Sequence, residues 1–141
     1  MTAAPAKLTN FQIESLLTQL PGWTIVAGKD LNKLPPEISE VTTLRSLTLG
    51  GLTDSTRISD LEALSSLFNL ERLHLGRTRV VNITPLARLK KLSNLNLSET
   101  RISDIVALSK LPNLSRLNLY RTRVTDLSPL KSRVWTHNLI Q

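Results

Sequence analysis

Few residues in this chain are of the types that perform acid–base or nucleophilic chemistry. There are two histidines, His74 and His137, which lie 63 residues apart, and there is no cysteine. A catalytic base must lie within hydrogen-bond reach of the group that it serves, and neither histidine stands in a motif with an acid or a serine. No glycine-rich phosphate loop is present. We therefore expect no enzymatic activity, no catalytic residue and no cofactor, and we interpret His74 as a surface contact.

Acidic residues recur at a regular spacing, and this pattern needs to be tested as a metal site. Asp60, Asp104 and Asp126 share one sequence column with Asn82. Repeated aspartates can bind calcium, but the calcium-binding repeats that use them are rich in glycine, and these segments are not. Each aspartate stands directly before an apolar pair, which is the place of a side chain that caps the first turn of a helix. We therefore predict helix caps and no metal site.

The acidic column is one part of a repeated unit. The pattern LxxLxL starts at four positions, which are separated by 26, 22 and 22 residues: Leu44, Leu70, Leu92 and Leu114. The alternation LxL predicts a short strand that points its leucines inward and the residues between them outward. Because about three residues cannot form a stable strand alone, each strand must pair in parallel with the next copy, about 4.8 Å away. The rest of each unit then returns through a single helical or 3₁₀ turn, and Pro85 and Pro129 suit its first positions.

These columns resemble the leucine-rich-repeat family, in its 22-residue bacterial, internalin-like form LxxLxLxxNxIxDIxPLxxLxx. Residues 92–113 (LSNLNLSETRISDIVALSKLPN) and 114–135 (LSRLNLYRTRVTDLSPLKSRVW) carry most of this pattern. The resemblance implies an α/β solenoid: a horseshoe segment with a short parallel β-sheet on the concave face and 3₁₀ or helical turns on the convex face. One departure is systematic, because the inward asparagine of the family is threonine here, at Thr56, Thr78, Thr100 and Thr122. A threonine hydroxyl can still bond backbone groups, so we expect the same fold with a slightly different turn.

The pattern also predicts how the chain is divided. We expect about five repeats, at 20–43 (degenerate), 44–69, 70–91, 92–113 and 114–135. Residues 1–19 are predicted to form a capping helix that covers the first repeat, because they combine a capping box with an apolar side and are followed by the helix stop signal Pro21-Gly22. Residues 136–141 are a tail. They either cap the last repeat together with Trp135, or the natural protein continues beyond them.

The segment LTNFQIESLLTQLPGW also resembles the start of pterin carbinolamine dehydratases. The similarity covers fewer than 20 residues, and the paired catalytic histidines of that family are absent. An inherited or convergent helix is therefore the preferred interpretation, and dehydratase activity is not expected.

Outward residues of the strands are the candidate binding surface. The resemblance implies that the concave face contacts a partner, and arginine and tyrosine are frequent in the centres of interfaces. The predicted strand contacts are Arg45, Thr48, Arg72, His74, Asn94, Asn96, Arg116 and Asn118. The predicted contacts just past the strands are Arg77, Tyr120 and Arg121. The copy at 44–69 is four residues longer than the others within the segment GGLTDS, which is either a binding loop or a tolerated bulge.

An arginine follows the threonine in every copy, and we include this column in the predicted surface: Arg57, Arg79, Arg101 and Arg123. These arginines lie between two inward residues and must face solvent. At a spacing of about 5 Å, each adjacent pair costs roughly 0.8 kcal/mol in water before screening. The column is either a basic stripe for an acidic partner or a set of residues paired locally with Asp60, Asp104, Asp126 or Glu99. From the sequence alone, local pairing is the preferred interpretation.

The charge of the chain bears on its partner. The net charge is +7, and residues 44–135 contain fifteen lysines and arginines against seven acidic residues. We predict a monomeric, non-enzymatic protein-interaction module whose partner is a protein with an acidic surface. Nucleic-acid binding is the alternative, disfavoured because stacking aromatics and a recognition helix are lacking; a structural fragment of a larger repeat protein is another. Without a membrane span or a signal core, the expected location is cytoplasmic, or that of a bacterial effector exported without a cleaved signal.

Overall fold

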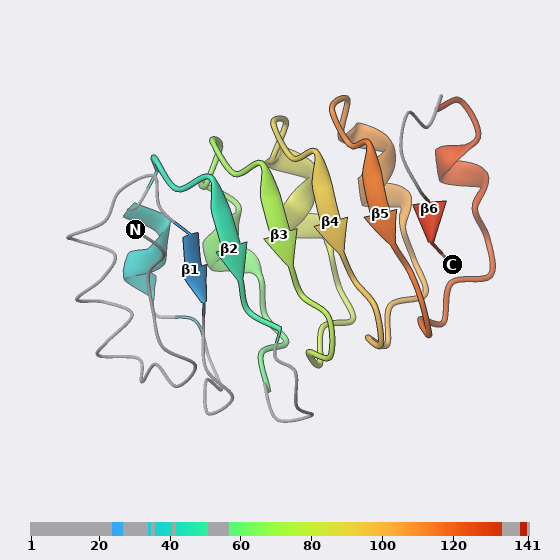
Figure 1. The fold of residues 1–141 in the computed structure, drawn as a ribbon, viewed down its shortest axis with the longest axis horizontal. Coiled ribbons are helices and arrows are strands. Elements are labelled where there is room, and N and C mark those ends of the chain that lie inside the picture. Colours follow the sequence, from blue (N-terminus) through green and yellow to red (C-terminus); the bar gives the residue numbers. More distant parts are fainter. Residues whose placement is uncertain are drawn as a thin grey trace.

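The computed structural model of the chain describes residues 24–26, 34, 36–40, 42–50, 57–133 and 139–140. Within them, six short strands form one sheet whose strand order follows the sequence. Figure 1 shows the strands side by side, with the 3₁₀ helices behind them. The strands are β1 (Thr24–Val26), β2 (Ser46–Thr48), β3 (Arg72–His74), β4 (Asn94–Asn96), β5 (Arg116–Asn118) and β6 (Leu139–Ile140). The 3₁₀ helices are η1 (Pro36–Glu40), η2 (Glu62–Leu64), η3 (Thr84–Arg88), η4 (Val106–Lys110) and η5 (Ser128–Leu130).

Every pair of neighbouring strands is parallel, and from β3 onward paired residues are 22 positions apart. Leu73 of β3 pairs with Leu95 of β4, which pairs with Leu117 of β5, which pairs with Leu139 of β6. The predicted parallel stacking of three-residue strands and the predicted 3₁₀ turns are therefore confirmed in these residues. The predicted capping helix at 1–19 lies outside the described residues.

The leucine columns form a continuous core between the sheet and the 3₁₀ helices. The central leucines of β2 to β5 (Leu47, Leu73, Leu95 and Leu117) are at most 2% exposed. Leucines and isoleucines of the turns pack against them from the other side. We call the opposite face of the sheet, from which the polar strand residues project, the strand face.

The acidic column bonds the first backbone N–H of each 3₁₀ helix from η2 to η5, although the N-cap residue is the apolar residue that follows it, at Leu61, Ile83, Ile105 and Leu127. The backbone N–H of Val106 donates to Asp104 Oδ1 at 2.8 Å, and that of Ser128 donates to Asp126 Oδ1 at 2.8 Å. Asp60 and Asn82 accept the equivalent bonds in the two preceding repeats. The bonds from Ser128, with Lys131 nearby, lower the pKa of Asp126. These oxygens are thus engaged by the backbone, and no group of three or more potential metal ligands occurs in the described residues.

Threonine closes the turn after each strand within its own repeat. The hydroxyl group donates to the main-chain carbonyl three residues earlier, at 2.7 Å for Thr78, 2.6 Å for Thr100 and 2.7 Å for Thr122. Thr78 and Thr100 are buried, so these bonds satisfy hydroxyl groups that water cannot reach. Thr56 lies outside the described residues.

Arg133 occupies the place of a core leucine at the end of the last repeat, and its guanidinium bonds backbone carbonyl groups of the repeat before it and of the start of its own repeat. The Nη2 atom donates to the carbonyl oxygen of Leu108 at 2.8 Å and of Ser109 at 3.4 Å, and Nη1 donates to that of Leu114 at 3.3 Å. Partial burial lowers the pKa of Arg133. The sequence indicated no convincing cap here, whereas the structure shows an arginine that satisfies three carbonyl groups. Trp135 lies outside the described residues.

Among the described residues, no helix is long and apolar enough to cross a membrane.

Candidate functional site

The parallel register arranges the predicted strand residues in two rows across the strand face. The first row is Ser46, Arg72, Asn94 and Arg116, and the second is Thr48, His74, Asn96 and Asn118. Arg45 lies directly before β2, with its Nε 4.0 Å from a carboxylate oxygen of Glu71. The structure therefore brings the predicted strand contacts together on one surface.

A hollow of about 230 Å³ lies on this surface over β2, β3 and β4. Its lining includes Leu47 and Leu73, whose side chains point into the core, so that their backbone forms the floor. The polar side chains around it are Ser46, Thr48, Arg72, His74, Asn94 and Asn96. A depression lined by backbone and polar side chains can receive a polar side chain of a partner.

Two asparagines of the second row have fixed orientations. Asn96 Oδ1 accepts hydrogen bonds from the backbone N–H of Ser98 at 2.9 Å and from its hydroxyl at 2.7 Å. Asn118 Oδ1 accepts from the backbone N–H of Tyr120 at 2.9 Å. A backbone N–H can only donate, so the side-chain oxygen must be the atom that faces it. Among the described residues, the NH₂ group of each asparagine therefore remains free to donate to a partner. The sequence analysis missed this, although an asparagine two residues before the bonded amide is a known turn signature.

His74 stands in the middle of the hollow. It is half-buried, and burial lowers the pKa of its imidazole below the ordinary value of 6.5. The ring lies beside Gly76, since a Cβ on that glycine would be 2.8 Å from His74 Nε2. His74 is therefore neutral at pH 7, so the positive charge on this face comes from arginine.

Acidification below pH 6.5 is expected to destabilise the fold through His74. The unfolded imidazole binds a proton near 6.5, whereas the buried imidazole binds it only at lower pH. The unfolded state then holds more protons, and the free energy of unfolding falls as the pH falls. Urea unfolding at about pH 7 and about pH 5 measures this loss. His74→Asn, which matches the rest of its row, should show a smaller loss. An equal fall in both proteins would contradict the prediction.

Just past the strands, three charged residues adopt a left-handed backbone. Arg77, Glu99 and Arg121 have φ angles of 62°, 57° and 54°, which is uncommon for residues other than glycine, asparagine or aspartate. The backbone N–H of Arg77 donates to Ser98 O at 2.9 Å, and that of Glu99 donates to Tyr120 O at 2.7 Å. This column therefore links the repeat at 70–91 to the repeat at 92–113, and that repeat to the one at 114–135.

The side chains of the same column form an ion-pair network. Glu99 Oε1 lies 2.9 Å from Arg77 Nε, and Glu99 Oε2 lies 3.8 Å from Arg121 Nη1. The Arg121 guanidinium lies 5.2 Å from the ring centre of Tyr120, whose side chain is exposed. The predicted contacts Arg77, Tyr120 and Arg121 are thus brought together, with Glu99 between the two arginines.

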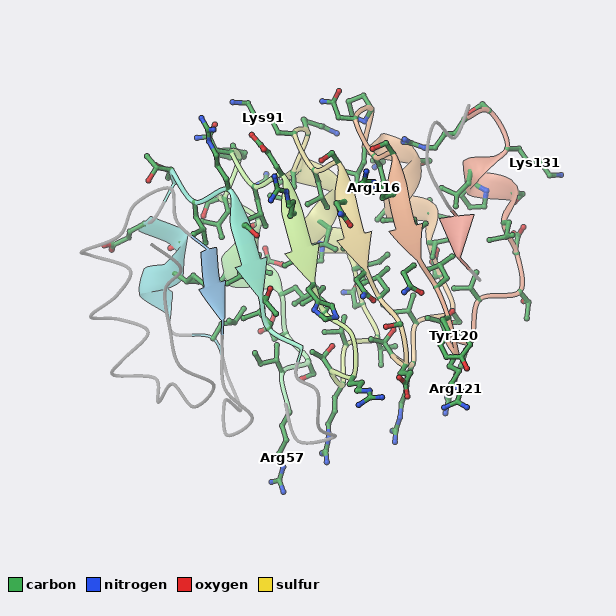
Figure 2. The ribbon with its side chains drawn as sticks, in the orientation of Figure 1. Arg57, Lys91, Arg116, Tyr120, Arg121 and Lys131 are labelled. Atoms are coloured by element: carbon green, nitrogen blue, oxygen red, sulfur yellow. The ribbon has the colours of Figure 1, made fainter. Side chains whose placement is uncertain are left out.

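A row of arginines lies at the edge of the sheet where strands β2 to β5 end, and we call this edge the carboxyl edge. The arginine row consists of Arg57, Arg79, Arg101 and Arg123. All four residues are exposed. Figure 2 shows Arg57, Tyr120 and Arg121 projecting from this edge, and Lys91 and Lys131 projecting from the opposite one.

Local pairing of the arginine row is not found in the described residues. The ion pairs that they contain join Arg45 to Glu71 and Glu99 to Arg77 and Arg121. The acids proposed as local partners have other roles, because the aspartates cap helices and Glu99 bridges the neighbouring column. The local pairs that the sequence interpretation favoured are therefore not seen among these residues.

A second hollow, of about 180 Å³, lies between η3 and η4 on the opposite side of the molecule. It is lined in part by Val81 and Val106, which are exposed, and by Lys110. Its polar members Asn82 and Asp104 accept helix-capping bonds.

Comparison with known proteins agrees with the geometry. A family model described as leucine-rich repeats in two copies matches residues 90–132. Internalin C2 of Listeria monocytogenes is similar over 94% of this chain and 55% of its own, with 29% identity and a TM-score of 0.75. The internalin InlF of the same organism is similar over 91% of this chain and 42% of its own, with 25% identity and a TM-score of 0.66.

A third solved structure supports the fold alone. The functional domain of InlJ from Listeria monocytogenes, described as including a cysteine ladder, is 24% identical over 82% of this chain and 24% of its own, with a TM-score of 0.65. This chain thus spans about half or less of the length of these proteins. No curated protein sequence matches it significantly. Folds of this kind generally mediate protein–protein interaction, through the extended surface that stacked repeats create.

Proposed function

We propose that this chain, a leucine-rich-repeat protein of the bacterial internalin-like type, binds another protein through its strand face and carboxyl edge and catalyses no reaction. The observation that carries this proposal is the composition of the two rows on the strand face. Within the described part of the chain, no internal acceptor engages Arg72, Arg116 or the NH₂ groups of Asn96 and Asn118. A partner rich in carboxylates or backbone carbonyls would satisfy them.

The distribution of charge supports an acidic partner. Residues 57–133 contain fourteen lysines and arginines against six acidic residues. Three of those acids cap helices and two, Glu71 and Glu99, already lie near arginines. Opposite charge on the partner would increase the association rate and select against basic proteins.

An affinity experiment with matched variants tests the proposal. Wild-type protein and the Arg72→Glu/Arg116→Glu variant are immobilised and exposed to lysate of the native host. The control is Arg88→Glu/Lys110→Glu, which makes the same charge change on η3 and η4, away from the strand face. We expect a protein that wild type and control retain and that the strand-face variant loses.

The dissociation constant of the purified partner gives the quantitative readout. We expect the strand-face variant to bind about a hundredfold more weakly, which corresponds to about 2.7 kcal/mol, and the control to bind within about threefold of wild type. Equal affinity for all three proteins would overturn the proposal. A labelled DNA duplex at low salt tests the nucleic-acid alternative, and tight binding that falls steeply with added salt would favour it.

A further inference from the structure

The backbone beneath the arginine row is rigidly spaced. The N–H of Arg79 donates to Ile58 O at 3.0 Å, and the N–H of Arg123 donates to Ile102 O at 2.8 Å. These bonds join successive repeats at the row itself, and the neighbouring strands are about 4.8 Å apart. The four guanidiniums therefore start from evenly spaced positions along the solenoid axis, over a length of about 14 Å.

The described residues supply the row with no counter-charge. No acidic side chain of the described residues forms an ion pair with Arg57, Arg79, Arg101 or Arg123. The nearest acids among the described residues bond helix N–H groups or belong to the network around Glu99, and Asp54 lies outside the described residues. Four exposed like charges in a line repel one another, and an anionic ligand would relieve that repulsion.

Glu99 shows how this edge accommodates a carboxylate. Its two oxygens contact Arg77 of the preceding repeat and Arg121 of the following repeat. A guanidinium presents a planar set of donors that matches a carboxylate well. In the neighbouring arginine row, successive guanidiniums are only one repeat apart, so a carboxylate from outside could bridge each adjacent pair in the same way.

We propose that the arginine row binds an extended acidic segment of the partner protein, which lies along the solenoid axis with its carboxylates between successive guanidiniums. This inference rests on the proposed function and assigns part of the partner's chemistry. An extended chain advances about 3.3 Å per residue, so about five residues cover the row. Tyr120 and Arg121 at one end of the edge are residue types that anchor protein interfaces. Single-stranded nucleic acid would require aromatic stacking along the row, and the row contains only arginine.

A fluorescent peptide of about eight consecutive glutamates is long enough to span the row and serves as the probe. Its binding is measured by anisotropy with wild type, with Arg79→Gln/Arg101→Gln and with the control Arg88→Gln/Lys110→Gln. The control removes the same charge from the same two repeats. We expect the row variant to bind about tenfold more weakly and the control to bind within about twofold of wild type. Unchanged urea midpoints verify folding.

Two results would overturn the inference. One is equal weakening by the row variant and the control, which would mean that the peptide senses only net charge. The other is a heparin or DNA probe that binds the row more tightly than the peptide at the same salt concentration and loses affinity in the row variant.

The purified partner separates this inference from the proposed function. If the row variant binds the partner like wild type while Arg72→Glu/Arg116→Glu does not, the row inference fails and the strand face remains the binding site. If the partner binds all variants equally, the proposed function itself fails. If the row variant weakens partner binding and peptide binding together, both are supported.

Discussion

Replacing Leu95 with alanine is expected to lower the free energy of unfolding by about 2–5 kcal/mol. Leu95 is the central residue of β4, is 1% exposed, and lies between Leu73 and Leu117 in the sheet register. Its truncation removes apolar contacts and leaves a cavity that the neighbouring repeats can fill only in part, because backbone bonds fix their spacing. Urea unfolding followed by circular dichroism measures the loss.

Leu95→Met is the matched control, because methionine has nearly the same volume and such exchanges usually cost less than about 1.5 kcal/mol. Both variants keep the strand face unchanged. A loss below about 1 kcal/mol for Leu95→Ala would mean that the leucine column is not the continuous core described above.

Replacing Gly50 with alanine should be the second most damaging single change, with an expected loss of about 1–3 kcal/mol. A Cβ on Gly50 would overlap the backbone carbonyl oxygen of Gly76 in the next repeat. That backbone cannot easily move, because the N–H groups of Leu49 and Gly50 both donate to His74 O, at 2.9 and 3.1 Å. The two repeats would have to separate locally.

Gly76→Ala provides the comparison for this prediction. A Cβ there would meet side-chain atoms, His74 Nε2 at 2.8 Å and Ser98 Oγ at 2.9 Å, and side chains can rotate away. We therefore expect a smaller loss of stability than for Gly50→Ala, measured in the same urea series. The reverse order would show that the close backbone approach at Gly50 is unimportant.

The sequence predicted the elements that depend on local pattern. Leucines at period two specify the inward side of a strand, and 22-residue spacing then specifies parallel register, because each strand can pair only with its counterpart in the next copy. The caps at Asp104 and Asp126 also followed from local sequence, since each bond spans only two residues.

Features that depend on side-chain reach were not predictable in the same way. The arginine row and Glu99 are close in sequence, yet Glu99 contacts the column of Arg77 and Arg121. Arg133 breaks the leucine pattern, and only the positions of the carbonyl groups of Leu108 and Leu114 show what its guanidinium does. The sequence pattern identified which residues face solvent. The three-dimensional contacts determine which of those residues remain available to bind a partner.

The left-handed turns at Arg77, Glu99 and Arg121 have a consequence for the entropy of association. Each such residue costs of order 1–2 kcal/mol in backbone conformation, and bonds to the next repeat hold two of them in place. Part of the conformational entropy that ordering this edge requires is therefore already lost when the chain folds. A surface ordered in advance loses less freedom on binding, and more of its contact energy remains as affinity. A partner that binds this edge would therefore contact a backbone whose conformation is already fixed.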